Sequence, residues 1–465
     1  MAITAGQAKA SNITAATTSA DVGTAPDQRK LYDFSDRVAE LSPEESPFFV
    51  YLNKMSKSPT DDSVFRFLEN RSKIDWTTRT FELSAHVNGE SAVTAGLQYA
   101  FSVDTSETGS AADVNWLQKG MVFAVQTLDA AIGTAYATVR VDSAVNDVGS
   151  SNTFTGRIIS LPSSDFSTGY NVLSDNDKCQ VIGTSFGEGT GSPDVWSKSL
   201  DDDYGYTQIF KTAAEMTNTA IATKYRGYSS EWERIWNLKL REHKVDIERA
   251  MLFGQRARQD GIQYSEGIVG HCVLNSAPTS GDSDLSYSPG TAYHRTLAEG
   301  EFTYDRLLSD FEVIFDPARG GSSAKLALVG LPVMSLFNKF GAGSLLRETS
   351  DASGTNVNHT YNVEQQYKDG SFGHKLLAVN TIHGDLNLVK EPLFRQFSSA
   401  YMMIVDMSQV AYRPLVGNGV NRDTHIITNV QQLDEDLRKD MILTEAGLEI
   451  TLPETHALYN FEAIT

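Results

Sequence analysis

The sequence predicts an α+β fold, in which a β-rich stretch precedes one long helix and a mixed helix–strand stretch follows it. Residues 62–200 consist of short β-branched and aromatic runs separated by Gly, Asn, Asp and Ser turns, which is the pattern of strands joined by tight loops. Residues 231–255 contain no proline and no β-branched run, which favours a single helix. After residue 300, helix-like and strand-like runs follow one another at short intervals. This grouping is typical of the α+β class.

The N-terminal segment predicts an arm rather than a folded unit. Residues 1–31 are rich in Ala, Thr, Ser and Gly and contain no aromatic residue, so they cannot bury enough apolar surface to fold alone. We expect a neighbouring subunit to hold this arm. Ser42 and Pro43 then suit the cap and the first turn of a short helix, which carries the apolar run 48–52 and ends near Met55.

The stretch 62–200 is expected to form a small antiparallel sheet or barrel. Its strand-like runs are VFRFLENRSKIDWTTRTFEL, MVFAVQTL, YATVRVDSAV and FTGRIISL. Polar and apolar residues alternate poorly in these runs and the loops are polar, so we expect a peripheral insertion rather than the main core.

The long helix is the most informative element of the chain. It follows the strand-like run TQIFKTAAEMTNTA, which begins at Thr207. Ser230 and Glu233 form an S-x-x-E capping box, and Gly254 stands where the helix is expected to stop. At 1.5 Å per residue the helix would be roughly 38 Å long.

The apolar residues of this helix form two stripes on nearly opposite sides. One stripe contains Trp232, Trp236, Leu240, Ile247 and Met251, and the other contains Ile235, Leu238, Val245 and Leu252. Such a helix needs cover on two sides. It is either a central helix inside one large domain or a helix covered by its own subunit on one side and by a neighbour on the other. We expect His243 to be a surface or interface residue.

The second half of the chain predicts a loop-rich connection followed by alternating helices and strands. The expected elements are a loop-rich stretch from Gly261 to Pro289, a helix from Glu301 to Phe315, a buried strand LALVGL, a short helix from Pro332 to Phe340, three strands within 375–410, and one or two final strands in which Pro453 marks an edge or a bend.

Composition excludes several classes of protein. With 40% hydrophobic and 21% charged residues in 465, the chain is globular rather than disordered. Its 59 acidic and 39 basic residues give a formal charge of −20, which makes it a poor sequence-independent binder of nucleic acid. This charge suits a wall that contains DNA without adhering to it, although solubility is the commoner reason for acidity.

Two cysteines, Cys179 and Cys272, have no CxxC or histidine partner spacing. They predict neither a disulfide framework nor a zinc site and fit a reducing cytoplasm. The sequence contains no signal peptide and no run of 18 apolar residues, so no membrane span or membrane partner is expected.

The search for catalytic motifs predicts no catalytic residue, no metal site and no cofactor. Ser185 lies in a G-x-S-x-G match, but the following EGTGSPD cannot start the helix that a nucleophile elbow requires. Gly187, Gly189 and Gly191 lack the remaining residues of a phosphate-binding loop. Asp175 and Asp177 lack the glycine and the distal glutamate of a calcium loop. The nine histidines are scattered without metal-ligand spacing.

The order of these segments resembles the major capsid proteins of tailed double-stranded DNA bacteriophages. The resemblance is carried by an arm, LSPEESPFF, a β insertion ending in IGTSFGEGTGSPD, then YTQIFKTAAEMTNTA, and a long helix closing in KVDIERAMLFGQ. ALVGLPVMSLFNKF, HGDLNLVKEPLFR and GLEITLPETHALYNF continue it. It spans nearly the whole chain and is strongest at 183–257 and 370–465.

The resemblance implies the Hong Kong ninety-seven type of capsid fold. It assigns the chain in order to an N-terminal arm at 1–40, a short helix at the arm base at 41–60, an extended β loop with a β insertion at 61–200, a peripheral domain at 201–258 with its spine helix at 229–255, an axial domain at 259–420, and a return to the peripheral domain at 421–465. No long charged scaffolding segment precedes the arm in this sequence.

The implied function is assembly of hexamers and pentamers into the icosahedral shell that encloses phage DNA, inside the host bacterial cytoplasm. The implied partners are further copies of the chain, a portal, and possible scaffolding and decoration or cement proteins. Expected assembly residues are the spine anchors Trp232 and Trp236, the arm-base anchors Phe48 and Phe49, and three arginines that pair across subunits: Arg226, Arg241 and Arg249. Packing within one subunit, or solvated charge, is the competing interpretation for each.

Two other classes of protein stay open on the sequence alone. A phage tail tube or fibre would share the virion setting, but the repeats or trimeric coiled coil typical of a fibre are not present in the sequence. A β-rich carbohydrate hydrolase would need two carboxylates about 5 to 9 Å apart in a cleft, and nothing in the sequence requires such a pair.

Overall fold

A computed structural model describes most of the chain from residue 47 onward. The described residues are 47–55, 57–71, 79–86, 93–103, 116–126, 136–143, 153–161, 177–193, 195, 197, 199–225, 229–280, 283–285, 290–298, 301–317, 321–344, 349–350, 356–357, 365–369 and 375–461. The expected arm, Ser42, Pro43 and Arg226 lie outside them.

The β-rich stretch forms a closed barrel, which confirms one of its two expected forms. In order around the barrel, its strands are β2 (Thr80–His86), β3 (Gln98–Val103), β6 (Thr153–Ser160), β5 (Tyr136–Val141), β4 (Met121–Gln126) and β7 (Lys178–Thr184). The interior is filled by phenylalanines that meet edge to face or stacked, with ring centroids 5.1 Å apart for Phe81 and Phe123. Inward and outward residues alternate clearly along β5 and β6, so the expectation of poor alternation was wrong.

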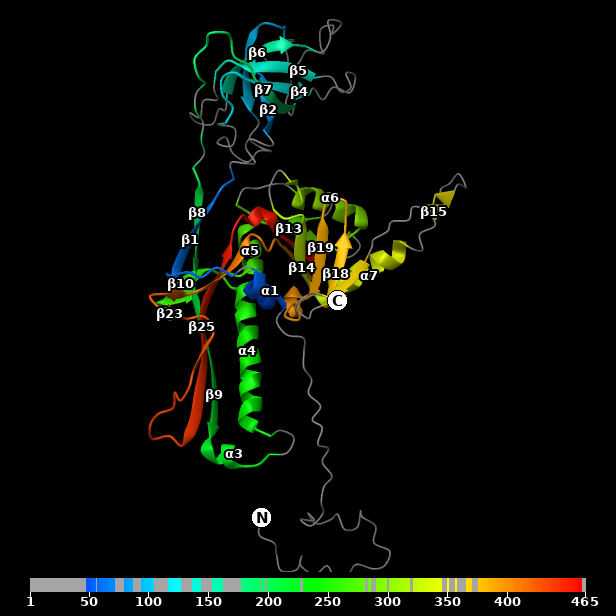
Figure 1. Ribbon diagram of the computed structural model, residues 1–465. Coiled ribbons are helices and arrows are strands. Elements are labelled where there is room, and N and C mark those ends of the chain that lie inside the picture. Colours follow the sequence, from blue (N-terminus) through cyan, green and yellow to red (C-terminus); the bar gives the residue numbers. More distant parts are fainter. Residues whose placement is uncertain are drawn as a thin grey trace, which may run out of the picture.

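The barrel stands apart from the rest of the chain and is joined to it by a two-stranded ribbon (Figure 1). The ribbon consists of β1 (Val64–Glu69) and β8 (Asp201–Tyr206), which pair antiparallel from Val64↔Tyr206 to Glu69↔Asp201. Arg71 is buried at its end and forms ion pairs with Glu69, with Asp201 and with Glu454 from the C-terminal segment. These pairs fix the end of the ribbon to the main body.

The long helix α4 (Glu231–Phe253) packs on a four-stranded sheet. The central strand β25 (Leu437–Ile450) pairs on one side with β9 (Gln208–Thr217) and on the other with β21 (Val410–Pro414) and β24 (His425–Ile427). A short helix, α3 (Asn218–Ala222), follows β9. The expected cap is confirmed, since Ser230 Oγ accepts a hydrogen bond of 3.2 Å from Glu233 N, and Gly254 ends the helix.

A second sheet of eight strands is mixed parallel and antiparallel. Its order is β12 (Thr279–Ser280), β13 (Tyr293–Leu297), β26 (Ala457–Phe461), β20 (Tyr401–Val405), β14 (Ala324–Val329), β19 (Asp385–Lys390), β18 (Lys375–Asn380) and β17 (Gln365–Asp369). The expected strand LALVGL is β14, and the three expected strands within 375–410 are β18, β19 and β20.

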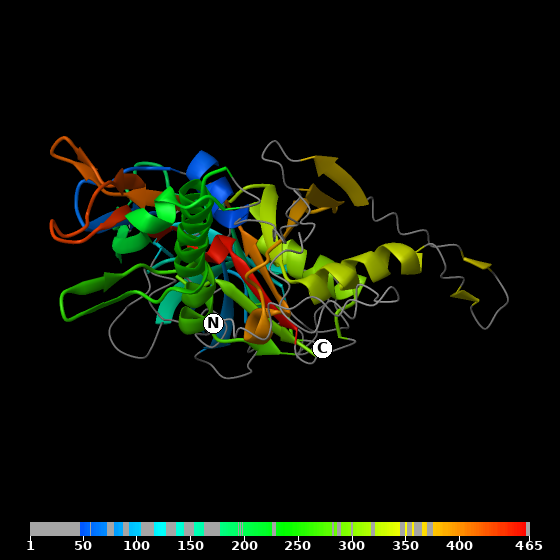
Figure 2. The same cartoon turned by 90° about the horizontal axis from the view of Figure 1, so that it is seen from below.

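Helices cover both faces of this sheet. Ala327 and Val329 of β14 face a core shared with α6 (Tyr304–Ile314) and α7 (Leu331–Ser344). Leu326 and Leu328 face a second core shared with α1 (Pro47–Met55), the end of α4 and α5 (Ile268–Asn275). Figure 2 shows α4 nearly end-on, with the four-stranded sheet to its left and the eight-stranded sheet to its right. Helix α5 corrects the expectation that 261–289 is only a loop-rich connection.

Short elements complete the described residues. They are the hairpins β10–β11 (Ala257–Gln259, Ile262–Tyr264), β15–β16 (Thr349–Ser350, Asn356–Val357) and β22–β23 (Val416–Gly417, Val420–Asn421), and the 3-10 turns η5 (Gln396–Ser398) and η6 (Pro453–Thr455). Pro453 therefore stands at the bend between β25 and β26, as expected. Within 421–465, β25 lies in the sheet beneath α4 and β26 lies between β13 and β20 of the eight-stranded sheet; the expected return of this segment to the peripheral domain stays a prediction.

Candidate assembly surface

The cover on α4 changes along its length. Its fully buried residues all lie in the C-terminal half: His243, Ile247, Glu248, Met251 and Leu252. In the N-terminal half, Trp232 and Trp236 are half-buried, and Leu238 of the opposite stripe is 49% exposed. The helix thus has full cover within the chain at one end and partial cover at the other.

His243 ties the buried side of α4 to the sheet. Its Nδ1 lies 2.9 Å from Thr212 Oγ1 on β9, and its Nε2 lies 2.8 Å from Thr444 Oγ1 on β25. Burial lowers the pKa of this imidazole, against a smaller opposing effect of Asp246. The expectation of a surface or interface histidine was wrong, because His243 lies on the same stripe as Leu240 and Ile247, which faces the sheet.

The two tryptophans pack within their own chain. The rings of Trp232 and Trp236 stack with centroids 6.2 Å apart and planes 19° from parallel. The guanidinium of Arg438, from the start of β25, lies 4.6 Å from the Trp232 ring, a distance at which a cation interacts with an aromatic face. These contacts fit the alternative interpretation, in which the two tryptophans pack within one subunit. Their role as intersubunit anchors stays a prediction.

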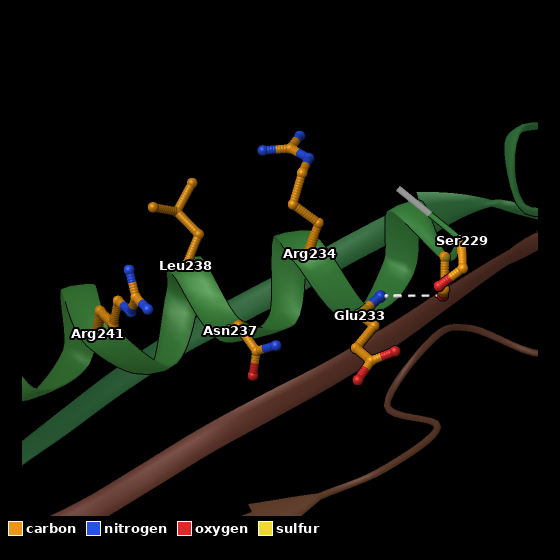
Figure 3. Close-up of a pocket in the computed structure, with 7 residues that line it drawn as sticks. Ser229, Glu233, Arg234, Asn237, Leu238 and Arg241 are labelled. Atoms are coloured by element: carbon orange, nitrogen blue, oxygen red, sulfur yellow. Dashed lines mark hydrogen bonds between the residues drawn. The ribbon is translucent and has the colours of Figure 1, made fainter. Parts of the chain in front are cut away.

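The outward side of the N-terminal half of α4 carries a shallow hollow of about 300 Å³. Arg234 and Leu238 project from the same side of the helix (Figure 3). Arg234 is held by Glu231, with Nε and Oε1 3.0 Å apart. Arg241 is exposed and also lines the hollow. An exposed leucine between two arginines is the composition of a contact surface rather than of a catalytic cleft.

The base of the expected arm is anchored in the core. Phe48 is fully buried and Phe49 is 6% exposed, and Phe49 meets the Tyr412 ring edge to face at 5.6 Å. The backbone N–H of Phe48 donates to Glu248 Oε1 at 2.7 Å, so a carboxylate of α4 satisfies an amide at the start of α1. Both phenylalanines are therefore core residues of this chain.

Glu248 belongs to a buried pair of carboxyl groups. Glu391 is 2% exposed, lies near enough to Glu248 for the two charges to interact, and accepts a hydrogen bond of 3.1 Å from Leu393 N. Burial raises the pKa of Glu391 to about 7, and burial together with the Glu391 charge raises the pKa of Glu248 well above its usual range. Sequence reasoning missed this pair, although the i, i+4 spacing of Glu248 and Leu252 places that carboxylate on an apolar stripe.

The predicted arginines do not form one cluster. Arg249 pairs with Asp246 on its own helix at 2.9 Å and is more than half exposed. It lies two turns from Arg241 toward the opposite end of α4, and Arg226 lies outside the described residues. Their pairing across subunits stays a prediction.

The described residues show no catalytic or metal-binding arrangement. Ser185 lies in a loop after β7, where its N–H donates to Gly120 O at 2.7 Å, and no helix follows it up to residue 193. No group of three or more His, Cys, Asp or Glu in the described part of the chain could hold a metal ion. Cys179 and Cys272 are buried free thiols. Of the helices that the structure describes, none has the length and apolarity needed to cross a membrane.

Solved structures that resemble this chain include phage and particle capsids at low similarity. Those labelled Mycobacterium phage Bobi and Microbacterium phage Oxtober96 are 8% and 9% identical, with TM-scores of 0.41 and 0.40. They cover 96% and 93% of this chain and 99% and 96% of their own. The capsid of an empty GTA particle is 8% identical with a TM-score of 0.34, covering 60% of this chain and 81% of its own.

A sequence family provides the decisive comparison. No curated protein matches the chain. The family described as SU10 major capsid protein, in contrast, matches residues 11–462, which is nearly the whole sequence. The match confirms the resemblance found in the sequence, the capsid type of fold and the role of a virion structural protein. The chain belongs to the SU10 major capsid protein family.

Proposed function

We propose that copies of this major capsid protein assemble as hexamers and pentamers into the icosahedral shell that encloses phage double-stranded DNA. The observation that carries the proposal is the partial cover on α4. Its buried stripe packs on the chain's own strands, whereas Leu238 and the hollow beside it stay open. An apolar stripe that its own chain leaves uncovered fits contact with a neighbouring subunit.

An open sheet edge supports the same proposal. Within the described residues, β9 pairs with β25 alone, so alternate residues of this ten-residue strand direct unpaired backbone groups toward its other edge. Ile209 on this strand is 49% exposed. A long open edge invites pairing with another chain, and a shell supplies neighbours at every position.

The charge of the chain fits the contents of a shell. A formal charge of −20 repels DNA phosphates, so the wall would enclose DNA without sequence-specific binding. In this proposal the chain acts by assembly and catalyses no reaction. The arm at 1–40, the extended loop at 61–200, the spine helix and the axial region keep the roles that the family resemblance implies. A portal and any scaffolding or decoration protein would join the shell in the host cytoplasm.

The test changes the open stripe without touching the core. Leu238→Asp places a charge at an exposed position, so the subunit should fold normally but lose its particles, because a contact surface does not tolerate an unpaired charge. Electron microscopy and sedimentation of the expressed protein measure particle yield. Trp236→Asp should also abolish assembly, but its ring packs within the chain, so Leu238→Asp is the cleaner variant.

Ser185→Ala provides the control, since this exposed loop serine has no part in assembly and should give normal particles. Normal particles from Leu238→Asp would contradict the proposed role of this stripe. A wild-type chain that stays monomeric in the same cells would contradict self-assembly itself.

A further inference from the structure

A second surface lies at the other end of α4. A groove of about 930 Å³ opens where α4, the start of α7 and the loop 390–399 meet. Leu331, Leu393 and Phe394 contribute apolar walls. Leu331 is 59% exposed and Phe397, beside the groove, is 73% exposed. Large exposed apolar side chains next to a groove are typical of a docking surface.

The rim of this groove is basic. Arg249, Lys390 and Arg395 line it, and the acidic residue among its lining, Glu391, is 2% exposed. Arg395 Nε donates to Pro392 O at 2.9 Å, which fixes the position of its guanidinium. Arg249 is also paired with Asp246 on its own helix, so Lys390 and Arg395 make the larger contribution to the positive charge of this rim on a chain that carries −20 overall. The matching partner is therefore an acidic segment with an apolar tip.

The loop 428–436, between β24 and β25, has this complementary character. Leu433 at its tip is fully exposed and is followed by Asp434, Glu435 and Asp436. Val430 N donates to Lys439 O at 2.8 Å, and Glu435 N donates to Gln432 O at 3.2 Å. These bonds hold Leu433 and Asp434 at the centre of a tight turn, so the tip is presented with little conformational entropy left to lose on docking.

The loop and the groove cannot meet within one chain. Arg438, just after the loop, contacts Trp232 near the N-terminal end of α4, whereas Arg249 at the groove lies near the C-terminal end. Seventeen helical residues separate these positions, which corresponds to roughly 25 Å along the helix axis. A loop held at one end of a rigid helix must therefore find such a groove on another copy.

We propose that the loop 428–436 of one copy docks into the groove of a second copy, with Leu433 beside Leu331 and Phe397 and the acidic residues facing the basic rim. The contact joins two different surfaces, so it is heterologous and propagates from copy to copy, closing a ring where the rotation permits. The inference rests on the proposed self-assembly and names one of the contacts that would hold it together.

Engineered cysteines test the contact in assembled particles. Leu433→Cys combined with Phe397→Cys should give disulfide-linked dimers and longer chains on a non-reducing gel after mild oxidation. The native Cys179 and Cys272 are 2% and 1% exposed and do not compete. Leu433→Cys with Ile382→Cys is the matched control, because Ile382 is 86% exposed but lies on the β18–β19 turn outside the groove, and it should give no cross-links above either single variant.

A charge exchange tests the same contact without cysteines. Arg395→Glu should raise the protein concentration needed for particle formation about tenfold, which corresponds to about 1.4 kcal/mol. Adding Asp434→Arg should recover most of that loss, because the exchange restores opposite charges across the contact. Both positions are exposed, so thermal melts of the unassembled subunits should match the wild type.

The outcomes separate this inference from the proposed function. Particles that form normally but give no 433–397 cross-link, or a charge exchange without recovery, would overturn the docking contact and leave the capsid assembly intact. If the wild-type chain forms no particles, self-assembly fails and the docking contact fails with it.

Discussion

The barrel and the α4 body are stabilised by different kinds of interior. The barrel core is a cluster of phenylalanines and aliphatic residues, and Asp177 is the buried acidic residue among its described part. The α4 body buries His243, Glu248, Asp440 and Glu445 among its apolar residues. Apolar burial does not titrate, whereas buried ionisable groups link folding to pH. The two regions should therefore respond to different perturbations, and three predictions separate them.

The largest expected effect lies in the barrel. Phe123 is fully buried and contacts Phe81, Phe101 and Phe154, so Phe123→Ala should destabilise the barrel by about 3–5 kcal/mol. Calorimetry should show one transition moving to lower temperature while the transition of the α4 body stays in place. A single transition that moves as a whole would show that the two regions unfold together. Tyr136→Ala is the control, because Tyr136 is a 56% exposed barrel residue and its replacement should leave the barrel transition in place.

The second prediction concerns the carboxyl pair of α4 and the loop 390–399. Because the folded pKa of Glu391 is raised to about 7, the folded state keeps protons that the unfolded state releases above its ordinary value near 4.5. The stability of the α4 body should thus fall as pH rises from about 4.5 through 7, by on the order of 3 kcal/mol. Thermal melts across this range should show the slope in wild type and a smaller slope in Glu391→Gln, in which the buried Glu248 still titrates; an unchanged slope in that variant would contradict the assignment.

The smallest effect concerns His243 and has the opposite sign. Its folded pKa lies below the ordinary 6.5, so its contribution to stability is present above pH 6.5 and is lost as pH falls through the lower folded value. We expect the stability of the α4 body to fall as the pH drops below 6.5. His243→Gln should remove this acid sensitivity, which urea denaturation at pH 6.5 and at a lower pH can measure. An unchanged acid sensitivity in this variant would contradict the assignment to His243.

Local signals in the sequence predicted the elements that local chemistry determines. The cap at Ser230, the stop at Gly254 and the bend at Pro453 are decided by neighbouring backbone, and each is where the pattern indicates. Helix α5 was missed because its run IVGHCVLN combines β-branched residues with Gly270. The structure explains this glycine: a Cβ at Gly270 would lie 2.2 Å from Gly254 O, so α5 crosses the end of α4 too closely for a side chain.

Features that depend on distant partners could not be predicted. The barrel closes through pairs such as β2 with β7, about a hundred residues apart in sequence, and no local pattern specifies that register. Glu248 and Glu391 are individually ordinary glutamates, and only the tertiary fold brings them together. His243 is a different case, since its spacing from Leu240 and Ile247 already indicated the buried stripe.

The ribbon of β1 and β8 has a mechanical consequence. Both strands run between the barrel and the body, so a force that separates these two parts pulls along both strands at once. The hydrogen bonds of an antiparallel pair lie perpendicular to the strands, and strands at about 3.3 Å per residue are close to full extension. The ribbon therefore acts as a short tie of fixed length that carries tension in its covalent backbone, and the ion pairs of Arg71 with Glu69, Asp201 and Glu454 brace it against the body.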